Sequence, residues 1–309
     1  FCIVFPMSFQ YLLLTQFLAK TLCKGGFAVL PVVTSIQGIK QKIKDFRKNS
    51  LTVGFVPTMG ALHEGHLSLA RQAKKENDKV VVSIFVNPLQ FGRNEDFSQY
   101  PKTLALDCEL LSDVGADMVF QPEASEMYPR GFCTTVAVER LEEQLCGKSR
   151  LGHFRGVAVV VLKLLHLIMP DIAYFGQKDF QQTVIIKRMV SDLNVDVAIK
   201  VLPIVRNAGG LALSSRNAYL IETEKVDALC LYQSLTKAQS MVNAGVFDAK
   251  KIIPEMENVI LAGKSASIDY ISIVHPETLE DALEARSGNV VAVAVRIGRT
   301  RLIDNIILS

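Results

Sequence analysis

Between two hydrophobic segments the chain reads Pro57-Thr58-Met59-Gly60-Ala61-Leu62-His63-Glu64-Gly65-His66. The preceding segment, Leu51–Val56, is a short apolar run of the kind that forms a buried strand. The following segment, Leu67–Asn77, has its apolar residues at helical spacing. The sequence therefore predicts a strand, a tight glycine-containing turn and then a helix, with His66 in its first turn.

Two histidines at the mouth of this helix favour a site for an anion. Backbone N–H groups at a helix N-terminus point toward whatever lies there and favour negative charge. Gly60 and Gly65 lack a Cβ, so a ligand can approach the backbone closely. A single histidine at such a turn usually caps or packs. His63 and His66 together indicate imidazoles that neutralise negative charge on a bound phosphate.

Two further strand ends carry polar side chains. The apolar run Lys79–Val86 predicts a strand buried on both faces of a parallel sheet, and Asn87 and Gln90 follow it. The shorter run Ile172–Phe175 predicts another strand, followed by Gly176-Gln177-Lys178-Asp179-Phe180-Gln181-Gln182. Because open α/β sheets bind ligands just past the carboxyl ends of their strands, both segments are candidates for a binding site.

The segment after Phe175 has residue types that suit a nucleotide. Lys178 would be an ordinary solvated lysine elsewhere, but at a strand–helix junction it can reach a phosphate as a point charge. Asp179 can cap the next helix, accept a hydrogen bond from a ribose hydroxyl, or hold Mg²⁺ through water. Gln182 lies one helical turn further on and can face the ligand.

Two loops are candidates for closing over this site. The segment Cys146–Gly156 is rich in glycine and basic residues, so it can either cover phosphates or form a solvated basic loop. The segment Gly209–Asn217 contains Ser214, Ser215 and Arg216. Two hydroxyls and a guanidinium that can fork across two phosphate oxygens predict a mobile anion clamp.

The order of elements predicts an α/β fold, with a Rossmann-type parallel sheet, helices on both faces and a smaller α+β C-terminal domain. We expect residues 1–31 to be an extension outside the fold. Residues 32–205 are expected to form the Rossmann-type ligand-binding domain. Residues 206–309 are expected to form the smaller lid domain.

Local patterns predict several finer features. A short strand is expected over 134–138, a buried helix over 157–169 and a longer amphipathic helix over 222–243. His166 lies in an apolar run and is expected to pack in the core. His275 precedes Pro276 and is expected to lie in a loop.

Composition excludes several classes of protein. The 309 residues are 49 % hydrophobic and 21 % charged, as in an ordinary globular protein, and the net charge of +3 is too small to indicate nucleic acid or a membrane surface. The apolar stretch Phe9–Leu22 is too short and interrupted to span a bilayer. The six cysteines lack zinc-site spacing, which favours reduced thiols in the cytoplasm. The glycine motifs of NAD and P-loop sites are missing.

Several segments together resemble the pantothenate synthetase (pantoate–β-alanine ligase) family, within the H-x-G-H nucleotidylyl-transferase superfamily. The matching segments, in the same order as in the family, are His63-Glu64-Gly65-His66, 82–100, 149–156, 176–182 and 209–217. The resemblance extends over Val32–Leu308. It implies a cytoplasmic enzyme that forms a homodimer and has no nucleic acid or membrane partner.

The resemblance also implies a two-step reaction on small molecules. Pantoate carboxylate attacks the α-phosphorus of ATP, giving pantoyl adenylate and pyrophosphate. The amine of β-alanine then attacks the acyl carbon, releasing AMP and pantothenate. Mg²⁺ is expected to arrive with ATP rather than to occupy a metal site of the protein.

The roles of the family's residues carry over to the matching positions as three sets. The catalytic residues are expected to be His63, His66, Lys178, Ser214, Ser215 and Arg216. The residues that bind ATP are expected to be those six together with Met59, Gly60, Gly176, Gln177, Asp179, Val205 and Leu213. Pantoate or β-alanine is expected to contact Asn87, Gln90, Tyr100 and Gln182.

One departure from the family pattern keeps other functions open. The family usually has Arg-Glu-x-Asp-Gly where this chain has Arg206-Asn207-Ala208-Gly209-Gly210. Two carboxylates are missing, and a glycine at 209 is expected to loosen the loop. A nucleotide-binding relative with weak or no turnover is therefore one alternative. A cytidylyl- or adenylyl-transferase without an amine step is another, although the segments 87–91 and 176–182 favour the ligase.

Overall fold

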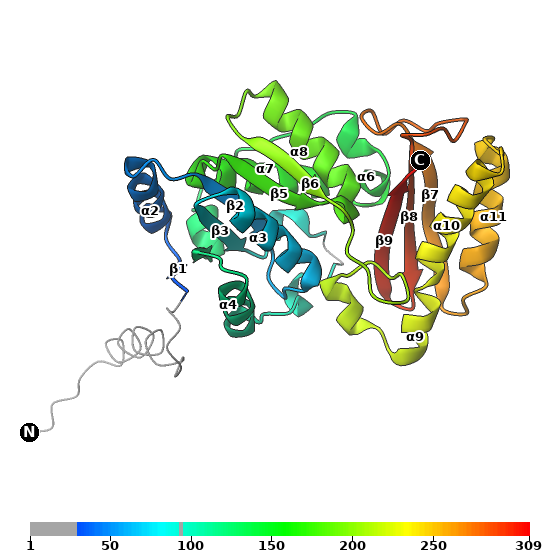
Figure 1. Ribbon diagram of the computed structural model, residues 1–309, viewed down its shortest axis with the longest axis horizontal. Helices are drawn as coiled ribbons and strands as arrows, with labels where there is room; N and C mark the ends of the chain where they lie inside the picture. Colours follow the sequence, from blue (N-terminus) through cyan, green and yellow to red (C-terminus); the bar gives the residue numbers. More distant parts are fainter. Residues whose placement is uncertain (1–29, 93–94) are drawn as a thin grey trace, which may run out of the picture.

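The computed structural model describes residues 30–92 and 95–309 and contains two sheets, each with its own helices (Figure 1). The predicted N-terminal extension lies outside the described residues, except for Leu30 and Pro31. The elements of the first unit are β1 (Val32–Val33), α2 (Ile36–Lys48), β2 (Val53–Thr58), α3 (Glu64–Glu76), β3 (Lys79–Ile84), α4 (Leu104–Asp113), β4 (Met118–Phe120), α5 (Ala124–Met127), α6 (Cys146–Ser149), α7 (His153–Ile168), β5 (Ile172–Gly176), α8 (Phe180–Asp192) and β6 (Ala198–Leu202). The elements of the second unit are α9 (Glu222–Asp227), α10 (Cys230–Asn243), α11 (Ala249–Leu261), β7 (Ala266–Val274), β8 (Val290–Ile297) and β9 (Thr300–Ile307).

The first sheet confirms the predicted Rossmann-type fold. Its six strands are parallel and lie in the order β1-β4-β3-β2-β5-β6. The chain leaves β2 toward β3 on one side and returns to β5 on the other, so the strand order reverses between β2 and β5. Ligands of such sheets bind at this switch point, just outside the carboxyl ends of the strands.

Helices cover both faces of this sheet, as predicted. Phe55 and Val81 point into a core formed with α2, α7 and α8, whereas Val56 and Val82 point into a core formed with α3 and α4. Alternate strand residues serve opposite faces, which explains why these strands are nearly continuous apolar runs.

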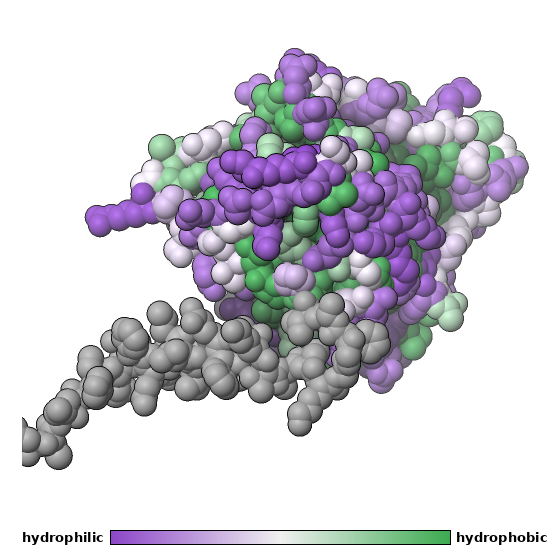
Figure 2. Space-filling view, turned by 60° about the vertical axis from the view of Figure 1, so that its left-hand side comes forward, coloured by the Kyte–Doolittle hydropathy of each residue, from purple (hydrophilic) through white to green (hydrophobic). Residues whose placement is uncertain are grey.

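The side of the molecule that carries α2 is largely hydrophilic at its surface (Figure 2). Within α2, Ile39 and Ile43 are buried, while the lysines at 40, 42 and 48 are exposed. Across residues 30–92 and 95–309, no helix has the length and apolar character needed to cross a membrane.

The second unit is the smaller α+β part that the sequence predicts. Its strands β7, β8 and β9 form an antiparallel sheet. One face of this sheet packs on α10 and α11, and the other packs on the first unit. In β8, Val291 and Val293 pack with α10 and α11, whereas Val290 and Ala292 pack toward Ile185 of the first unit. Burial on both faces accounts for the apolar run Val290–Val295 in β8, which the exposed Arg296 follows.

Several local predictions were wrong. Residues 134–138 form no strand, because their backbone pairs with no strand in the described part of the chain, although Val136 and Val138 pack on the core. The helix expected over 222–243 is divided into α9 and α10. At the break, the carboxylate of Asp227 accepts hydrogen bonds from the N–H and the hydroxyl of Ser265.

The helix expected over 157–169 begins four residues earlier than predicted, at His153, directly after Gly152 with φ +79°. His166 is exposed rather than packed in the core, because the helical period turns its position away from the buried residues Leu164, Leu165 and Leu167. His275 is exposed and lies outside the helices and strands, as predicted.

Candidate active site

A buried carboxylate holds the turn that carries the two histidines. The side chain of Asp107, on α4, accepts hydrogen bonds from the backbone N–H groups of Ala61 (3.0 Å) and Leu62 (2.8 Å), and Asp107 is only 1 % exposed. Gly60 has φ +82°, and a Cβ at this position would come within 3.1 Å of the Asp107 carboxylate. Gly60 therefore shapes the turn, where a side chain would be strained.

The hydrogen bonds of the histidines fix which ring nitrogen carries the proton. His63 caps the N-terminus of α3, and its Nδ1 accepts from the N–H of Gly65 at 3.2 Å. The Nδ1 of His66 accepts from the N–H of His63 at 3.4 Å. A nitrogen that accepts carries no proton, so each neutral ring has its proton on Nε2, available to donate.

Both imidazoles are neutral at pH 7. Burial is the main cause that lowers the pKa of His63 to about 4, and Lys178 lowers it further. Burial also lowers the pKa of His66 to about 3, with His63 as the second cause. Without a ligand, these rings therefore offer hydrogen-bond donors rather than positive charges.

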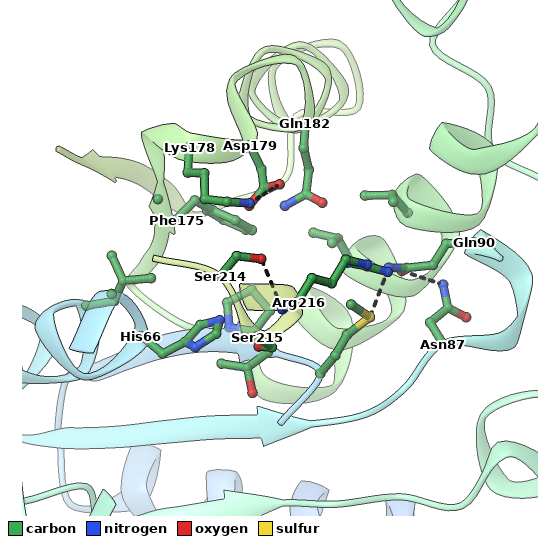
Figure 3. Close-up of a pocket in the computed structure, with 18 of the residues that line it drawn as sticks. His66, Asn87, Gln90, Phe175, Lys178, Asp179, Gln182, Ser214, Ser215 and Arg216 are labelled. Carbon is green, nitrogen blue, oxygen red and sulfur yellow. Dashed lines mark hydrogen bonds and ion pairs between the residues drawn. The ribbon is translucent and has the colours of Figure 1, made fainter. Parts of the chain in front are cut away.

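A cavity of about 230 Å³ lies at the carboxyl ends of β2 and β5 (Figure 3). Lys178, Asp179 and Gln182 lie on one side of it, across from Ser214, Ser215 and Gln90. The predicted site residues that line it are Met59, His63, His66, Asn87, Gln90, Tyr100, Gly176, Lys178, Asp179, Gln182, Val205, Leu213, Ser214, Ser215 and Arg216.

Two predicted ATP-binding residues are not part of the cavity wall. Gly60 lies beneath the histidine turn, as described above. Gln177 points toward the second unit, and its Nε2 donates to Oδ1 of Asn305 at 3.2 Å. Both residues shape the backbone around the cavity without presenting a side chain to it.

Lys178 and Asp179 form an ion pair at the cavity wall. The Nζ of Lys178 lies 3.6 Å from Oδ1 of Asp179. Burial opposes ionisation of Asp179, but the neighbouring charge of Lys178 favours it, and the pKa of this carboxyl lies below its ordinary value. Asp179 stands at the N-cap of α8 and makes no capping hydrogen bond, so its carboxylate remains available to the cavity.

The predicted clamp is connected to the histidine turn. The Oγ of Ser215 donates to the carbonyl oxygen of Ala61 at 2.9 Å, and the Oγ of Ser214 accepts from the N–H of Arg216. The guanidinium of Arg216 pairs with Asp96 at 2.8 Å. The Ser215 hydroxyl is therefore used within the protein, whereas the Ser214 hydroxyl and the Arg216 guanidinium are donors at the cavity wall that an anion can reach.

The loop with the missing carboxylates has hydrogen bonds of its own. The Oδ1 of Asn207 accepts from the N–H groups of Gly209 and Leu211, both at 3.0 Å. The left-handed φ in this loop belongs to Gly210, at +94°, and a Cβ there would lie 2.2 Å from the ring of Tyr232. These contacts oppose the loosening expected from Gly209.

Sequence reasoning did not single out Arg150 and His153, although both line the cavity. Arg150 forms a two-point ion pair with Glu95 at 2.7 Å and donates to Nε2 of His153 at 2.8 Å. The Nδ1–H of His153 donates to the carbonyl oxygen of Gln90 at 2.7 Å. The signal was present in the basic segment 149–156, but the segment does not indicate where its side chains point.

The apolar wall of the cavity was also missed. It consists of Phe85, Val157, Val160, Val161, Leu164 and Phe175. Most of these residues lie on one side of α7, and their sequence pattern cannot be distinguished from that of ordinary core residues.

Fold and site together define a class of α/β enzyme, with a Rossmann-type sheet and an anion-compatible cavity at its switch point. Within this class, residues 31–307 match the family model described as pantoate-beta-alanine ligase, and the chain belongs to that family.

Known relatives agree over nearly their whole length. The chain is 50 % identical to the pantothenate synthetase of Caldicellulosiruptor bescii over 277 residues, covering 90 % of this chain and 98 % of the relative. It resembles the crystal structure of pantothenate synthetase from Thermus thermophilus, with a TM-score of 0.84, 42 % identity and coverage of 90 % and 99 %. It also resembles the pantoate-beta-alanine ligase of Francisella tularensis complexed with beta-gamma ATP and beta-alanine, with a TM-score of 0.76, 34 % identity and coverage of 90 % and 97 %.

Proposed function

We propose that this enzyme condenses pantoate with β-alanine to form pantothenate, using ATP and passing through a pantoyl adenylate. One observation carries the residue assignments. A single cavity at the switch point contains hydrogen-bond donors suited to phosphates together with amides suited to a small hydroxy acid.

In the first step, a carboxylate oxygen of pantoate attacks the α-phosphorus of ATP. The bond from this phosphorus to the bridging oxygen breaks, and pyrophosphate leaves with the electron pair. The Nε2–H groups of His63 and His66, the ammonium of Lys178 and the donors of the 214–216 clamp would stabilise charge on the phosphates. Such chemistry depends on positioning and charge stabilisation more than on a protein nucleophile.

In the second step, the amine of β-alanine attacks the acyl carbon of the adenylate. The bond between the acyl carbon and the phosphate oxygen breaks, AMP leaves with the electron pair, and the nitrogen loses a proton. Gln90 and Gln182 would hold the pantoyl part by neutral hydrogen bonds. The apolar wall along α7 would pack against its methyl groups and exclude water from the adenylate.

The residues present fit a magnesium ion that arrives with ATP. Proteins usually bind Mg²⁺ through one or two carboxylates plus the phosphates of the substrate. Among the described residues of the cavity wall, Asp179 is the carboxylate available for this. When bound, the ion would offset negative charge on the phosphates.

The test is pantoate-dependent exchange of labelled pyrophosphate into ATP, with Mg²⁺ and without β-alanine. We expect exchange only when pantoate is present, followed by pantothenate formation when β-alanine is added. Exchange without any product on adding amines would favour a transferase that lacks the amine step. Binding of ATP without exchange would favour the relative with impaired turnover.

We further propose that the enzyme is a homodimer and acts in the cytoplasm, where ATP is available. The resemblance to its family supports both statements. Light scattering coupled to size-exclusion chromatography tests the first, with twice the mass of the chain as the expected result. A monomer at micromolar concentration would contradict it.

A further inference from the structure

Tyr128 lies outside the cavity wall and outside every motif that the sequence singles out. It directly follows α5, a helix of only four residues. Its Oη lies 2.8 Å from Oδ1 of Asn87, at the end of β3. This hydrogen bond connects the segment after α5, which has no role in the proposed function, to Asn87. Asn87 belongs to the part of the cavity where pantoate or β-alanine is expected to bind.

Backbone groups fix the orientation of the Asn87 amide. The Oδ1 of Asn87 accepts from the N–H of Leu89 at 3.2 Å, and its Nδ2 donates to the carbonyl oxygen of Gly156 at 3.0 Å. A backbone N–H can only donate and a carbonyl can only accept, so the reverse orientation would lose both bonds. Asn87 is 1 % exposed, which makes such a loss costly.

The fixed amide determines what its two neighbours do. The Oδ1 of Asn87 can only accept, so the hydroxyl of Tyr128 must be the donor. The second hydrogen on Nδ2 of Asn87 then points to Oε1 of Gln90, at 3.0 Å. With its oxygen engaged, Gln90 must present its Nε2–H₂ group to the other side, toward Met59 and the cavity (Figure 3).

The ring of Tyr128 is itself held in place. Its centroid lies 6.1 Å from that of Phe85 and 5.1 Å from that of Phe132, and the Nζ of Lys163 lies 5.8 Å from it. Burial raises the pKa of the Tyr128 hydroxyl, so it remains protonated and able to donate at physiological pH. Phenylalanine can keep the ring contacts and lose only the hydrogen bond.

We propose that Tyr128 is a positioning residue: its hydroxyl reinforces the orientation of the Asn87 amide, which in turn holds the amide of Gln90 with its N–H groups facing the acid substrate. The ligand chemistry that suits this arrangement is an acceptor oxygen, carboxylate or hydroxyl, as pantoate provides. The inference rests on the proposed function, and it replaces direct substrate contact by Asn87 with an indirect role. The Asn87 amide has no hydrogen-bonding group left to offer.

The test compares Tyr128→Phe with Tyr174→Phe. The control variant Tyr174→Phe also removes one buried hydroxyl, which in the wild type donates to Glu76 at 2.7 Å. The side chain of Tyr174, however, lies in the core under α3 and α4. We expect Tyr128→Phe to raise the KM for pantoate about threefold to tenfold, as the loss of one neutral hydrogen bond would. The KM for ATP should stay within twofold. Tyr174→Phe should change neither constant.

A second variant tests the orientation itself. Asn87→Asp removes the donor to Gln90, so the Gln90 amide should turn and present its oxygen to the pantoate carboxylate. We expect the KM for pantoate to rise at least as far as in Gln90→Ala. A pantoate KM in Tyr128→Phe equal to that in Tyr174→Phe, or an equal rise for ATP and pantoate, would overturn the proposal.

Binding measurements separate failure of this inference from failure of the proposed function. Titration calorimetry with pantoate and a non-hydrolysable ATP analogue gives a Kd without turnover. A wild-type protein that binds pantoate but exchanges no pyrophosphate would contradict the proposed function. The pantoate Kd of Tyr128→Phe, compared with that of Tyr174→Phe, would still test the positioning role of Tyr128. A wild-type protein that binds no pantoate would overturn both.

Discussion

At the scale of single residues, the two histidines of the turn are neutral, and each has its proton on Nε2. Their Nδ1 atoms accept backbone hydrogen bonds, and burial keeps both rings uncharged at pH 7. The positive charge at this side of the cavity comes from Lys178 instead. The histidines therefore offer directed hydrogen bonds, whereas Lys178 offers a point charge.

The first prediction concerns His66. His66→Ala removes one Nε2–H donor, so pantoate-dependent pyrophosphate exchange should fall by about 10²-fold or more, the scale of lost transition-state stabilisation. The rate of exchange at saturating ATP and pantoate measures this, with the melting temperature as a control for folding. Turnover equal to that of the wild type would remove His66 from the site.

The second prediction concerns stability against pH. His63, His66 and His153 have folded-state pKa values of about 4, 3 and 4, below the ordinary 6.5, mainly because of burial. Below pH 6.5 the unfolded chain therefore binds protons that the folded chain does not, and stability falls as the pH is lowered from 6.5 toward 4. The lowered pKa values of Glu76 and Glu95, about 2, act only below about pH 4.5.

Urea denaturation at pH 6.5 and pH 5.0 isolates this effect. Replacing His66 by Gln should reduce the loss of unfolding free energy across this interval by about 1.6 kcal/mol. An identical loss in wild type and variant would mean that His66 is not held neutral by the fold.

At the scale of elements, the loop between β6 and α9 replaces two missing carboxylates with an amide. Asn207 accepts from two backbone N–H groups of its own turn. Arg206 pairs at two points with Asp304, with one distance of 2.9 Å, and stacks 4.2 Å from the ring centroid of Tyr232. The clamp at 214–216 thus extends from a loop anchored on both sides.

The third prediction tests whether Asn207 stabilises this loop in place of the missing carboxylates. Asn207→Ala should lower the exchange rate about threefold to tenfold, because two N–H groups lose their acceptor and the clamp is positioned less well. Gly209→Asp should give no gain, since its Cβ would lie 3.0 Å from Leu229 and 3.5 Å from the Asn207 oxygen. Exchange rates under identical conditions decide both. A faster Gly209→Asp enzyme would show that the departure from the family pattern is a defect.

At the scale of the whole molecule, β9 contacts two of the segments that contribute residues to the cavity wall. Asp304 binds Arg206 at the base of the clamp loop, and the Nδ2 of Asn305 donates to the carbonyl oxygens of Gln177 and Lys178 at 3.1 and 3.0 Å. Neighbouring residues of one strand therefore fix the C-terminal unit against two sides of the cavity. The second sheet is therefore part of the structure that surrounds the cavity.

The fourth prediction concerns this junction. Asp304→Ala leaves the guanidinium of Arg206 largely buried without its partner, so the free energy of unfolding should fall by about 3 kcal/mol. The double variant Asp304→Leu with Arg206→Met should lose less than the single one, because no unpaired charge remains. Chemical denaturation measures both. A single variant as stable as wild type would mean that the pair contributes nothing.

The sequence by itself determined the architecture and the edge of the sheet where the site lies. Apolar runs predicted the three central strands β3, β2 and β5, and polar residues after Val56, Val86 and Phe175 indicated one ligand-binding edge. These features depend on neighbours in the chain, which a sequence displays directly.

Tertiary structure alone decided how the side chains act. It showed that Asn87 contacts Gln90, that Gln177 turns toward Asn305, and that His166 is exposed. It also brought Asp107 beneath the histidine turn, 45 residues away along the chain. Burial and hydrogen bonding between distant segments set protonation and orientation, and no local pattern in the sequence encodes those pairings.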